Sequence, residues 1–415
     1  MASEVTGVHQ RDLVGQQIVD YEPRVDAARL KRERLARLQA ELGRAELGAA
    51  LLYDPLNIRY ATGTRDSSTG YGLRFYYRYA LVPRTGRAIL FGGVTDSLAG
   101  DATLDVRNAR TWDFFPCGRN LGEAARRWAA DLKATIDELG LGRERIGIDR
   151  LDFVGFEALR AQQLRLADAR VAVEKARAIK TPDELTLIRQ ACAVVDAAIC
   201  ALRDAIRPGV TENELWAVLT GTNIRLGGEH ADGRLLTAGG HTNPWYQAAS
   251  DRLVRDGELV AFDTDMAGPL GYFADISRTY LCGDRPPTAE QRELYAFAHR
   301  FIQESIPLFR PGMGFQEIAE KAPAFPEKYK ASRYVVLAHG AGMSDEWPAI
   351  YFPDMSWSGF GNDPEVLQEN MVICVEALVG EENGRESVKL EEQLIVTAHG
   401  PEVISRAPYD WRFIG

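Results

Sequence analysis

Three closely spaced carboxylates mark the part of the sequence with the clearest chemistry. Asp263 and Asp265 come directly after the apolar run 259–262, and Asp275 follows ten residues after Asp265 on a returning apolar stretch. In an extended strand, residues two apart point to the same face, so we expect Asp263 and Asp265 to project together. Crowded carboxylates on a buried face are costly unless a cation neutralises them, whereas a solvated acidic turn needs none. The apolar flanks favour the buried arrangement.

An imidazole and two further carboxylates follow on later apolar runs. His339 ends one such run, and Glu376 and Glu391 lie within two others. Taken alone, a histidine in this setting is more often a core or turn residue. Together with Asp265 and Asp275, however, these residues offer four carboxylates and one imidazole. Such a set suits two divalent ions, such as iron, manganese, cobalt or zinc, bridged by carboxylates at about 3.5–4 Å.

An internal repeat indicates how the chain brings these ligands together. Arg-Pro-Gly at residues 207–209 recurs at residues 310–312, and each copy precedes a new helical segment. The runs 257–263 and 370–376 also match, because each leads from turn residues through an apolar strand to a carboxylate. A period of roughly 105–115 residues is too long for a solenoid array. It predicts two related α/β halves that face each other across a central sheet.

A smaller α/β unit precedes these halves. After a charged, helix-prone leader that ends near residue 45, short apolar runs between residues 49 and 91 are separated by Pro, Gly and Ser, as strands would be. Residues 181–184 (Thr-Pro-Asp-Glu) form a capping box with Pro at the first helical position, so a new helix should begin there. We therefore expect an α/β (α+β) protein with an N-terminal domain at residues 1–175 and a catalytic domain at residues 176–415.

Composition excludes several classes of function. The 59 acidic residues outnumber the 49 basic ones, for a net charge of −10, which argues against binding to nucleic acid or to anionic lipid. The first 17 residues are polar, and no uncharged apolar run reaches about 18 residues, so neither a signal peptide nor a membrane span is expected. The five cysteines are scattered, without a Cys-x-x-Cys pair, which favours a reducing cytoplasm.

The order of the predicted ligands resembles the creatinase, aminopeptidase P and prolidase superfamily. Five residues match its metal-ligand signature in order: Asp265, Asp275 (before Ile-Ser-Arg-Thr), His339 (in His-Gly-x-Gly), Glu376 and Glu391. The resemblance covers residues 181–415 closely. It implies the pita-bread fold, in which two repeated α/β halves surround two metal ions, with a small α/β domain in front.

The chain departs from the peptidases of that superfamily at their proton-handling positions. Peptidases carry a single Asp between the positions of Asp263 and Asp265. They also carry a His before the first ligand strand, where residues 239–246 of this chain end in aromatics. A second peptidase His, followed by Glu-x-Pro, is replaced by Asp345. Because the chain has only six histidines and both of these positions lack one, histidine-driven peptide hydrolysis is disfavoured.

The same departures resemble the dimethylsulfoniopropionate lyase branch of the superfamily. Four segments carry this resemblance: 243–245 (Asn-Pro-Trp), 263–265 (Asp-Thr-Asp), 345–348 (Asp-Glu-Trp-Pro) and 374–381. It implies iron as the metal, a homodimer, Asp263 as a sixth ligand, Asp345 as the general base, and Tyr334 in the wall of the pocket.

The chemistry of such a reaction fits the residues. The substrate is a small zwitterion, a sulfonium with a carboxylate two carbons away. Metal binding of that carboxylate would acidify the adjacent C–H, and Asp345 could then remove the proton, releasing dimethyl sulfide and acrylate. Desolvation beside Trp347 would raise the pKa of this base. The faces of four aromatic residues could hold the sulfonium by cation–π contact: Trp245, Tyr246, Tyr334 and Trp347.

We therefore predict a metal-dependent carbon–sulfur lyase that acts on dimethylsulfoniopropionate or a close analogue. The alternative is a metal-dependent C–N hydrolase of the Xaa-Pro dipeptidase or creatinase kind, and a third possibility is a binding module with an inactive metal site. Asp345 in place of the second His favours the lyase. Residues 64–78, rich in Arg and Tyr, depart from the lyase pattern and would suit a more anionic or bulkier substrate.

Overall fold

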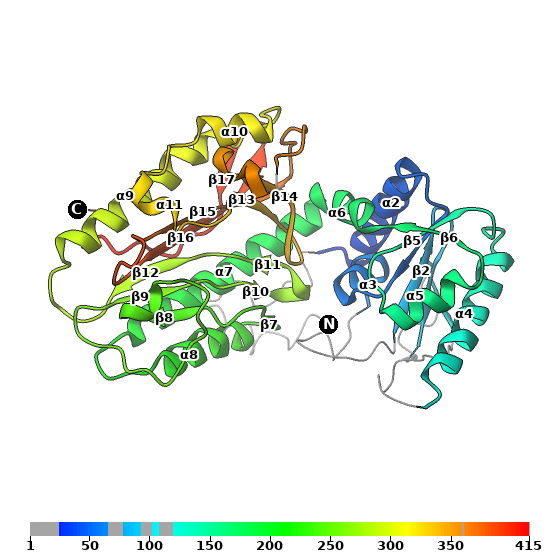
Figure 1. The fold of residues 1–415 in the computed structure, drawn as a ribbon, viewed down its shortest axis with the longest axis horizontal. Helices are drawn as coiled ribbons and strands as arrows, with labels where there is room; N and C mark the ends of the chain where they lie inside the picture. The colour runs from blue at the N-terminus through cyan, green and yellow to red at the C-terminus, as the bar shows by residue number, and fades with distance from the viewer. Residues whose placement is uncertain (1–24, 65–77, 93–101, 108–118, 359–360, 415) are drawn as a thin grey trace, which may run out of the picture. The chain divides into compact units, whose positions relative to one another are not determined.

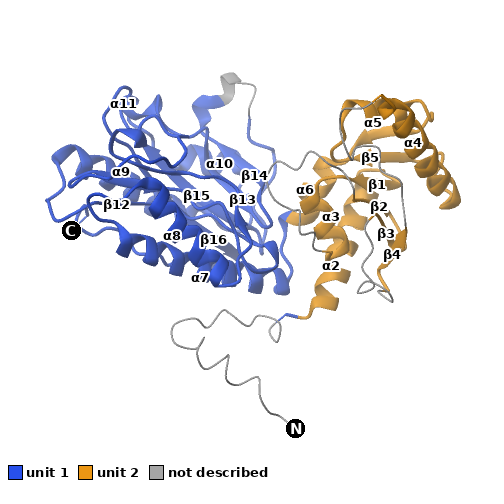
Figure 2. Cartoon of the chain, turned by 90° about the horizontal axis from the view of Figure 1, so that it is seen from below, with its two compact units in different colours: residues 1–25, 178–415 blue, residues 26–177 orange. Residues whose placement is uncertain are grey.

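The structure is a computed structural model of the chain. It describes residues 25–64, 78–92, 102–107, 119–358 and 361–414. The chain divides into two compact units, one of residues 26–177 and one built on residues 178–415 (Figures 1 and 2). The predicted domain boundary between residues 175 and 176 lies inside helix α6 (Arg170–Ala178), just before this division. The predicted leader up to residue 24 and the segment 65–77 lie outside the described residues.

The N-terminal unit is built on one mixed sheet with the strand order β4-β3-β2-β1-β5-β6. Its strands are β1 (Ala49–Leu52), β2 (Tyr79–Pro83), β3 (Ala88–Phe91), β4 (Leu104–Arg107), β5 (Arg145–Ile148) and β6 (Arg165–Asp168). Its helices are α2 (Ala27–Arg44), α3 (Pro55–Thr62), α4 (Leu121–Glu138), α5 (Phe153–Arg160) and α6. The central strand β1 is buried throughout, and it pairs antiparallel with β2 and parallel with β5. The short apolar runs predicted between residues 49 and 91 are therefore confirmed as strands β1 to β3.

A buried aspartate organises the turn between β1 and α3. The carboxylate of Asp149 accepts hydrogen bonds from the backbone N–H of Tyr53 at 2.8 Å and of Asp54 at 3.2 Å. It also accepts from the Asn57 side-chain amide at 2.9 Å and from the backbone N–H of Arg150 at 2.6 Å. Asp54 in turn caps the first turn of α3. One carboxylate thus satisfies four donors where strand passes into helix.

Replacing Asp149 by alanine is expected to destabilise the N-terminal unit by about 3 kcal/mol, because buried donors left without an acceptor cost about 1–3 kcal/mol each and relaxation recovers part of the loss. Chemical denaturation followed by circular dichroism measures this change. Asp137→Ala removes an exposed acid on α4 and should alter the free energy of unfolding by less than about 0.5 kcal/mol. Equal effects of the two variants would contradict the assigned role of Asp149.

The C-terminal unit contains three sheets with the strand orders β11-β10-β7, β12-β9-β8 and β14-β13-β15-β16-β17. Its longer strands are β8 (Leu236–Ala238), β9 (Leu259–Phe262), β12 (Arg278–Leu281), β13 (Val336–Ala341), β14 (Asp345–Tyr351), β15 (Val372–Val379), β16 (Val388–Thr397) and β17 (Gly400–Val403). The two-residue strands are β7 (His230–Ala231), β10 (Met266–Ala267) and β11 (Phe273–Ala274). Its α-helices are α7 (Pro182–Ala205), α8 (Glu212–Arg225), α9 (Ala289–Ser305), α10 (Phe315–Lys321) and α11 (Glu327–Lys330). The 3₁₀ segments are η3 (Gly239–Thr242), η4 (Pro269–Gly271), η5 (Ile306–Leu308) and η6 (Pro353–Ser358).

The helices of this unit lie on two sides of its strands. Figure 1 shows α7 and α8 on one side and α9 to α11 on the other, as two facing α/β halves require. The repeated Arg-Pro-Gly turns lie at equivalent places, each between a long helix and the next one. Both glycines adopt a left-handed backbone, with φ of 89° at Gly209 and 86° at Gly312, which explains why glycine recurs there.

Helix α7 confirms the predicted start of the catalytic unit. The Thr181 side chain accepts from the backbone N–H of Glu184, and the Glu184 side chain accepts from the backbone N–H of Thr181, so the capping box is complete. The sequence analysis expected no membrane span, whereas by length and composition alone this helix could cross a membrane. Here 56% of its apolar stretch is buried inside the unit, where the helix contacts α8 and β11 as a core helix.

Candidate metal centre

Neighbouring strands of the large sheet carry three of the predicted ligands. Glu376 of β15 and Glu391 of β16 are direct cross-strand partners, and His339 of β13 pairs with Cys374 of β15. Like charges placed directly opposite each other on neighbouring strands destabilise a sheet unless a positive charge lies between them. Both glutamates are buried, so water does not screen their repulsion. The pairing itself therefore requires a positive charge at this position.

The imidazole of His339 lies among the carboxylates. Its Nε2 is 3.5 Å from Asp275 Oδ2, 3.4 Å from Glu391 Oε1 and 3.8 Å from Glu376 Oε1. One ligand oxygen from each of Asp263, Asp265 and Asp275 lies within 4.8 Å of the others. The structure thus brings together all six predicted metal ligands.

The hydrogen bond of His339 Nδ1 explains why Nε2 faces the carboxylates. Nδ1 lies 3.1 Å from the carbonyl oxygen of Gly340, which suits a proton on Nδ1 and leaves a lone pair on Nε2. The chain bulges at this point, between His339 and Gly340. A Cβ atom on Gly340 would lie 2.5 Å from the backbone oxygen of Trp347, so only glycine permits this approach to β14.

The convergence of Asp263 and Asp265 has a different cause from the predicted one. We expected two residues on one face of an extended strand, but β9 ends at Phe262 and Asp265 adopts φ of 40°. In this left-handed conformation, which Asp tolerates better than most residues, the backbone turns and returns the Asp265 carboxylate toward Asp263 and Asp275. The expected proximity is correct, whereas the expected strand geometry is wrong.

The donor atoms fit a cation. Among the described residues, Asp275 Oδ1 and Glu391 Oε1 are buried oxygens without a hydrogen-bond partner. Glu391 Oε1 faces His339 Nε2, so an acceptor meets a lone pair when Nδ1 carries the proton. Either a proton on Nε2 or a metal ion between the two atoms would stabilise this contact, and a metal ion would also satisfy Asp275 Oδ1. Oxygen donors with one imidazole suit hard to borderline divalent ions.

The pKa values of the cluster also indicate a missing positive charge. Burial and the neighbouring Asp263 raise the pKa of Asp265 well above its usual range, and burial and Glu391 do the same for Asp275. Burial raises the pKa of Glu376 to about 7. Burial opposes the charging of His339, but Asp345 and Glu391 outweigh it and raise its pKa. The protein alone therefore binds protons where metal ions would neutralise the carboxylates.

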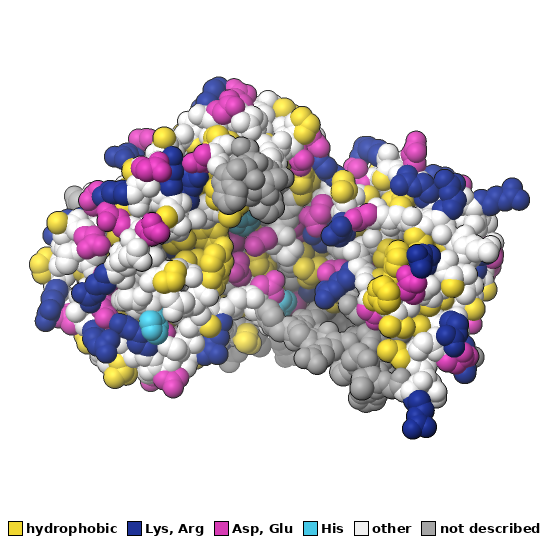
Figure 3. Space-filling model, in the orientation of Figure 1, with side chains coloured by type: hydrophobic (Ala, Val, Ile, Leu, Met, Phe, Trp, Pro, Cys, Tyr) yellow, Lys and Arg dark blue, Asp and Glu magenta, His cyan; other side chains and the backbone are white. Residues whose placement is uncertain are grey.

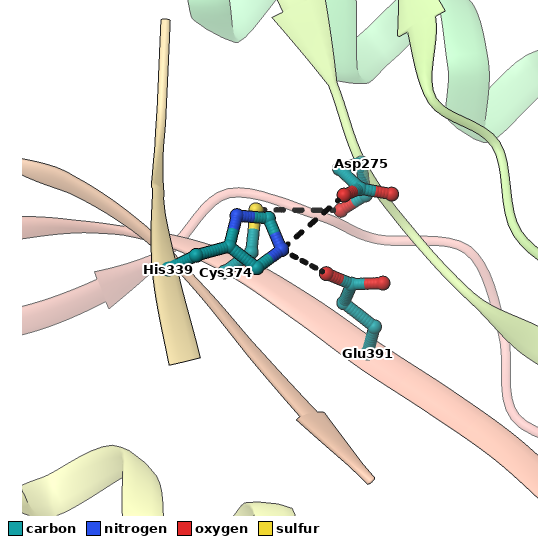
Figure 4. Close-up of side chains that lie close together, drawn as sticks. All are labelled: Asp275, His339, Cys374 and Glu391. Atoms are coloured by element: carbon teal, nitrogen blue, oxygen red, sulfur yellow. Dashed lines mark hydrogen bonds and ion pairs between the residues drawn. The ribbon is translucent and has the colours of Figure 1, made fainter. Parts of the chain in front are cut away.

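Two residues near the ligands were not predicted. Figure 4 shows the Cys374 side chain beside Asp275, His339 and Glu391, with its Sγ 3.7 Å from the Asp275 carbonyl oxygen. Lys389 is fully buried, with its Nζ 2.8 Å from Glu376 Oε2 and 2.9 Å from Glu391 Oε2. Alternation along β16 is a signal that could have revealed Lys389, because residues two apart share a face.

Asp345 lies at the edge of this cluster, at the first position of β14. Its Oδ1 is 3.7 Å from His339 Nδ1, and 58% of its side chain is exposed, so a substrate can reach it. Loss of part of its hydration raises its pKa, and His339 opposes this shift. The next residue, Glu346, points inward and forms a buried ion pair with Lys180 at 2.8 Å. This pair anchors the backbone that presents Asp345.

Three of the four predicted aromatic residues gather in one place. Trp245 Nε1 donates to the Tyr334 hydroxyl at 2.8 Å, and the Tyr246 ring meets the Tyr334 ring edge-on at 5.4 Å. Trp245 and Tyr246 also line a cavity of about 410 Å³. Trp347 instead packs against Phe315 of α10, with ring centroids 5.3 Å apart. A substrate-binding role for Trp347 stays a prediction.

Two other histidines have partners outside the carboxylate cluster. His241 Nδ1 lies 3.3 Å from Glu212 Oε1 at the start of α8. His299 of α9 contacts the rings of Tyr409 and Trp411.

Acidic and basic side chains are mixed over the face of each unit that Figure 3 shows.

Comparison with known families divides the chain as the fold does. Residues 186–398 match the model of metallopeptidase family M24, and residues 34–179 match the creatinase/prolidase N-terminal domain. The Xaa-Pro dipeptidase from Bacillus anthracis superposes with a TM-score of 0.72 over 92% of this chain and 99% of that one, at 21% identity. These matches confirm the expected fold class.

Two curated relatives represent the two predicted activities. The chain is 33% identical to the dimethylsulfoniopropionate lyase DddP of Roseovarius nubinhibens over 94% of its own length and 89% of that protein. It is 29% identical to the Xaa-Pro dipeptidase of Pyrococcus furiosus, over 56% of its own length and 65% of that protein. The similarity to the lyase therefore includes the N-terminal unit as well as the metal centre, and it is higher.

Proposed function

Since this chain belongs to metallopeptidase family M24, we propose that it is a metal-dependent lyase that cleaves the carbon–sulfur bond of dimethylsulfoniopropionate, giving dimethyl sulfide and acrylate. One observation carries this proposal. A solvent-accessible carboxylate, Asp345, lies beside the candidate metal centre at the position where the peptidase pattern has an imidazole. The 33% identity to a dimethylsulfoniopropionate lyase along nearly the whole chain supports it.

Six residues would hold two divalent ions: Asp263, Asp265, Asp275, His339, Glu376 and Glu391. When bound, the ions would withdraw charge from the substrate carboxylate and so make the neighbouring C–H more acidic. We propose iron as the metal, as the resemblance to the lyases implies; the donor set of oxygens with one imidazole suits iron, and equally manganese, cobalt or zinc. Elemental analysis by mass spectrometry of protein purified from its native source separates iron from manganese, zinc and cobalt.

The residues around the centre would divide the remaining work. Asp345 removes the proton from the carbon next to the carboxylate, and the electrons of that bond form the new C=C bond. The electron pair of the C–S bond leaves with dimethyl sulfide, so no further reactant is needed. Burial raises the pKa of Tyr334 far above its usual value, so its hydroxyl stays protonated and serves to position groups rather than to act as a base.

The test of this function is direct. Metal-loaded protein is incubated with dimethylsulfoniopropionate, and the headspace is sampled by gas chromatography while acrylate is measured in solution. We expect equal amounts of dimethyl sulfide and acrylate. If no gas forms at full metal occupancy, the lyase assignment is wrong. Release of proline from an Xaa-Pro dipeptide would then favour the C–N hydrolase.

Two further features belong to the same proposal. We propose a homodimer, which light scattering coupled to size-exclusion chromatography measures. We also propose a cytoplasmic location, supported by cysteines 192, 200, 282 and 374, which are free thiols in the described part of the chain. Cell fractionation with an antibody to the protein tests that location.

A further inference from the structure

Lys389 places a fixed cation inside the cluster of carboxylates. It lies on β16 two residues before Glu391, and its side chain has no exposed surface. Its Nζ is 3.1 Å from Asp263 Oδ2, 2.8 Å from Glu376 Oε2 and 2.9 Å from Glu391 Oε2. Lysine is rarely fully buried unless its charge is paired, and here three carboxylates lie within ion-pair distance of the ammonium.

The remaining contacts of Lys389 hold it on one side of the cluster. Its Nζ donates to Ser277 Oγ at 2.9 Å and lies 4.7 Å from the centre of the Tyr334 ring. The Ser277 hydroxyl also lies 2.7 Å from Asp263 Oδ1 and 2.8 Å from Glu391 Oε2. The ammonium is therefore fixed by hydrogen bonds, ion pairs and an aromatic face.

The oxygens of the glutamates divide between two partners. Oε2 of Glu376 and Oε2 of Glu391 contact Lys389, whereas Oε1 of each faces His339. Both oxygens of Asp263 already have protein partners, since Oδ1 accepts from Ser277 and from the backbone N–H of Thr264, and Oδ2 contacts Lys389. Lys389 and the oxygens that lack partners thus lie on different sides of the carboxylate groups.

We propose that Lys389 is a positioning residue of the metal centre, the built-in counter-ion that balances its additional carboxylate. Two divalent ions neutralise four carboxylates, and the cluster has a fifth, Asp263, in direct contact with the lysine. The Asp263–Lys389 pair thus adds no net charge to the set of four carboxylates and one imidazole. Without metal, the ammonium keeps Asp263, Glu376 and Glu391 in place. This inference rests on the metal centre of the proposed function but not on its substrate.

The test compares melting temperatures of Lys389→Met and wild type, each with and without bound metal, by calorimetry. The metal-free variant should melt about 10 °C below metal-free wild type, because three buried carboxylates lose their cation. The loaded variant should lose less than half as much, because bound ions take over part of the neutralisation. Mass spectrometry confirms the metal content of each sample. No substrate is used in this test. The counter-ion role can therefore be refuted while the lyase activity is confirmed, and the lyase activity can be refuted while the counter-ion role is confirmed.

A double variant separates charge from packing. Asp263→Asn combined with Lys389→Met removes both members of the pair, and it should recover at least half of the melting temperature lost by the metal-free single variant. Lys180→Met is the matched control, since Lys180 is equally buried but pairs with Glu346, which is outside the ligand set. It should lower the metal-free and loaded melting temperatures equally. If Lys389→Met also lowers both equally, or if neither it nor the double variant folds without metal, Lys389 is not the counter-ion.

Discussion

Replacing Asp345 by alanine should leave both metal ions bound and reduce turnover of dimethylsulfoniopropionate about 10²–10⁴-fold. This is the usual contribution of a positioned general base. The carboxylate lies beside His339 but is more than half exposed, so its removal opens space at the rim of the centre without taking a ligand from its interior. Gas chromatography of dimethyl sulfide gives the rate, and mass spectrometry gives the metal content of the same sample.

The isosteric change Asp345→Asn sharpens this test. It preserves the volume of the side chain but removes its negative charge and its ability to accept a proton, so it should reduce turnover as much as alanine does. Asp204→Ala, an exposed acid at the end of α7, is the control and should leave the rate within about twofold of wild type. If Asp345→Asn keeps most of the activity, another group removes the proton, and the reason for preferring the lyase over the hydrolase weakens.

The clustering of the predicted ligands could be foreseen because the chemistry of buried carboxylates restricts where they can lie. Few arrangements explain Asp275, His339, Glu376 and Glu391 on successive apolar runs, since a buried carboxylate needs a cation. The strands that carry them were predictable for the same reason, as apolar runs bounded by turn residues. The repeat of Arg-Pro-Gly turns showed that two halves exist, although it gave no strand order.

Side chains that replace backbone pairing were not predictable. The returning apolar stretch that carries Asp275 is not one continuous strand, because it is interrupted between β11 and β12. Here the backbone N–H of Asp275 donates to Gln393 Oε1 at 3.0 Å, and that of Ile276 donates to Thr264 Oγ1 at 2.9 Å. Gln393 is 118 residues from Asp275 in the sequence, and Thr264 lies across the hairpin from Ile276, so no local sequence pattern reveals these partners. The left-handed turn at Asp265 escaped prediction because Asp adopts it only when tertiary contacts favour it.

Aromatic residues were the weakest part of the sequence-based prediction. Trp245, Tyr246 and Tyr334 meet, although 89 residues separate Trp245 from Tyr334. Trp347, only two residues from Asp345, packs on Phe315 instead. Aromatic residues are common both in protein cores and in binding pockets. The position of an aromatic residue next to a catalytic residue in the sequence therefore does not decide which residues its ring contacts. The carboxylates are easier to place because leaving them unpaired is costly.

Replacing Glu391 by alanine should abolish metal binding at the centre. Turnover should then fall at least about 10³-fold, which corresponds to several kcal/mol of transition-state stabilisation by the metal. Glu391 contacts both sides of the cluster, since Oε1 faces His339 at 3.4 Å and Oε2 contacts Lys389 at 2.9 Å. Lys389 and His339 outweigh the effect of burial and hold the pKa of Glu391 below its usual range, so Glu391 is ionised before metal binds. Elemental analysis and the headspace assay measure both effects.

Chelation distinguishes loss of metal from loss of structure. Wild-type protein stripped by a chelator should lose activity to the same degree and recover it when metal is returned, whereas Glu391→Ala should not recover. Glu402→Ala is the control, because Glu402 is an exposed acid on β17 of the same sheet and pairs with Arg189 rather than with the ligands. It should keep its metal and its rate. Full activity in metal-depleted Glu391→Ala would mean that the reaction does not need the metal, because Asp345, the proposed base, lies outside the ligand set and is unchanged in this variant.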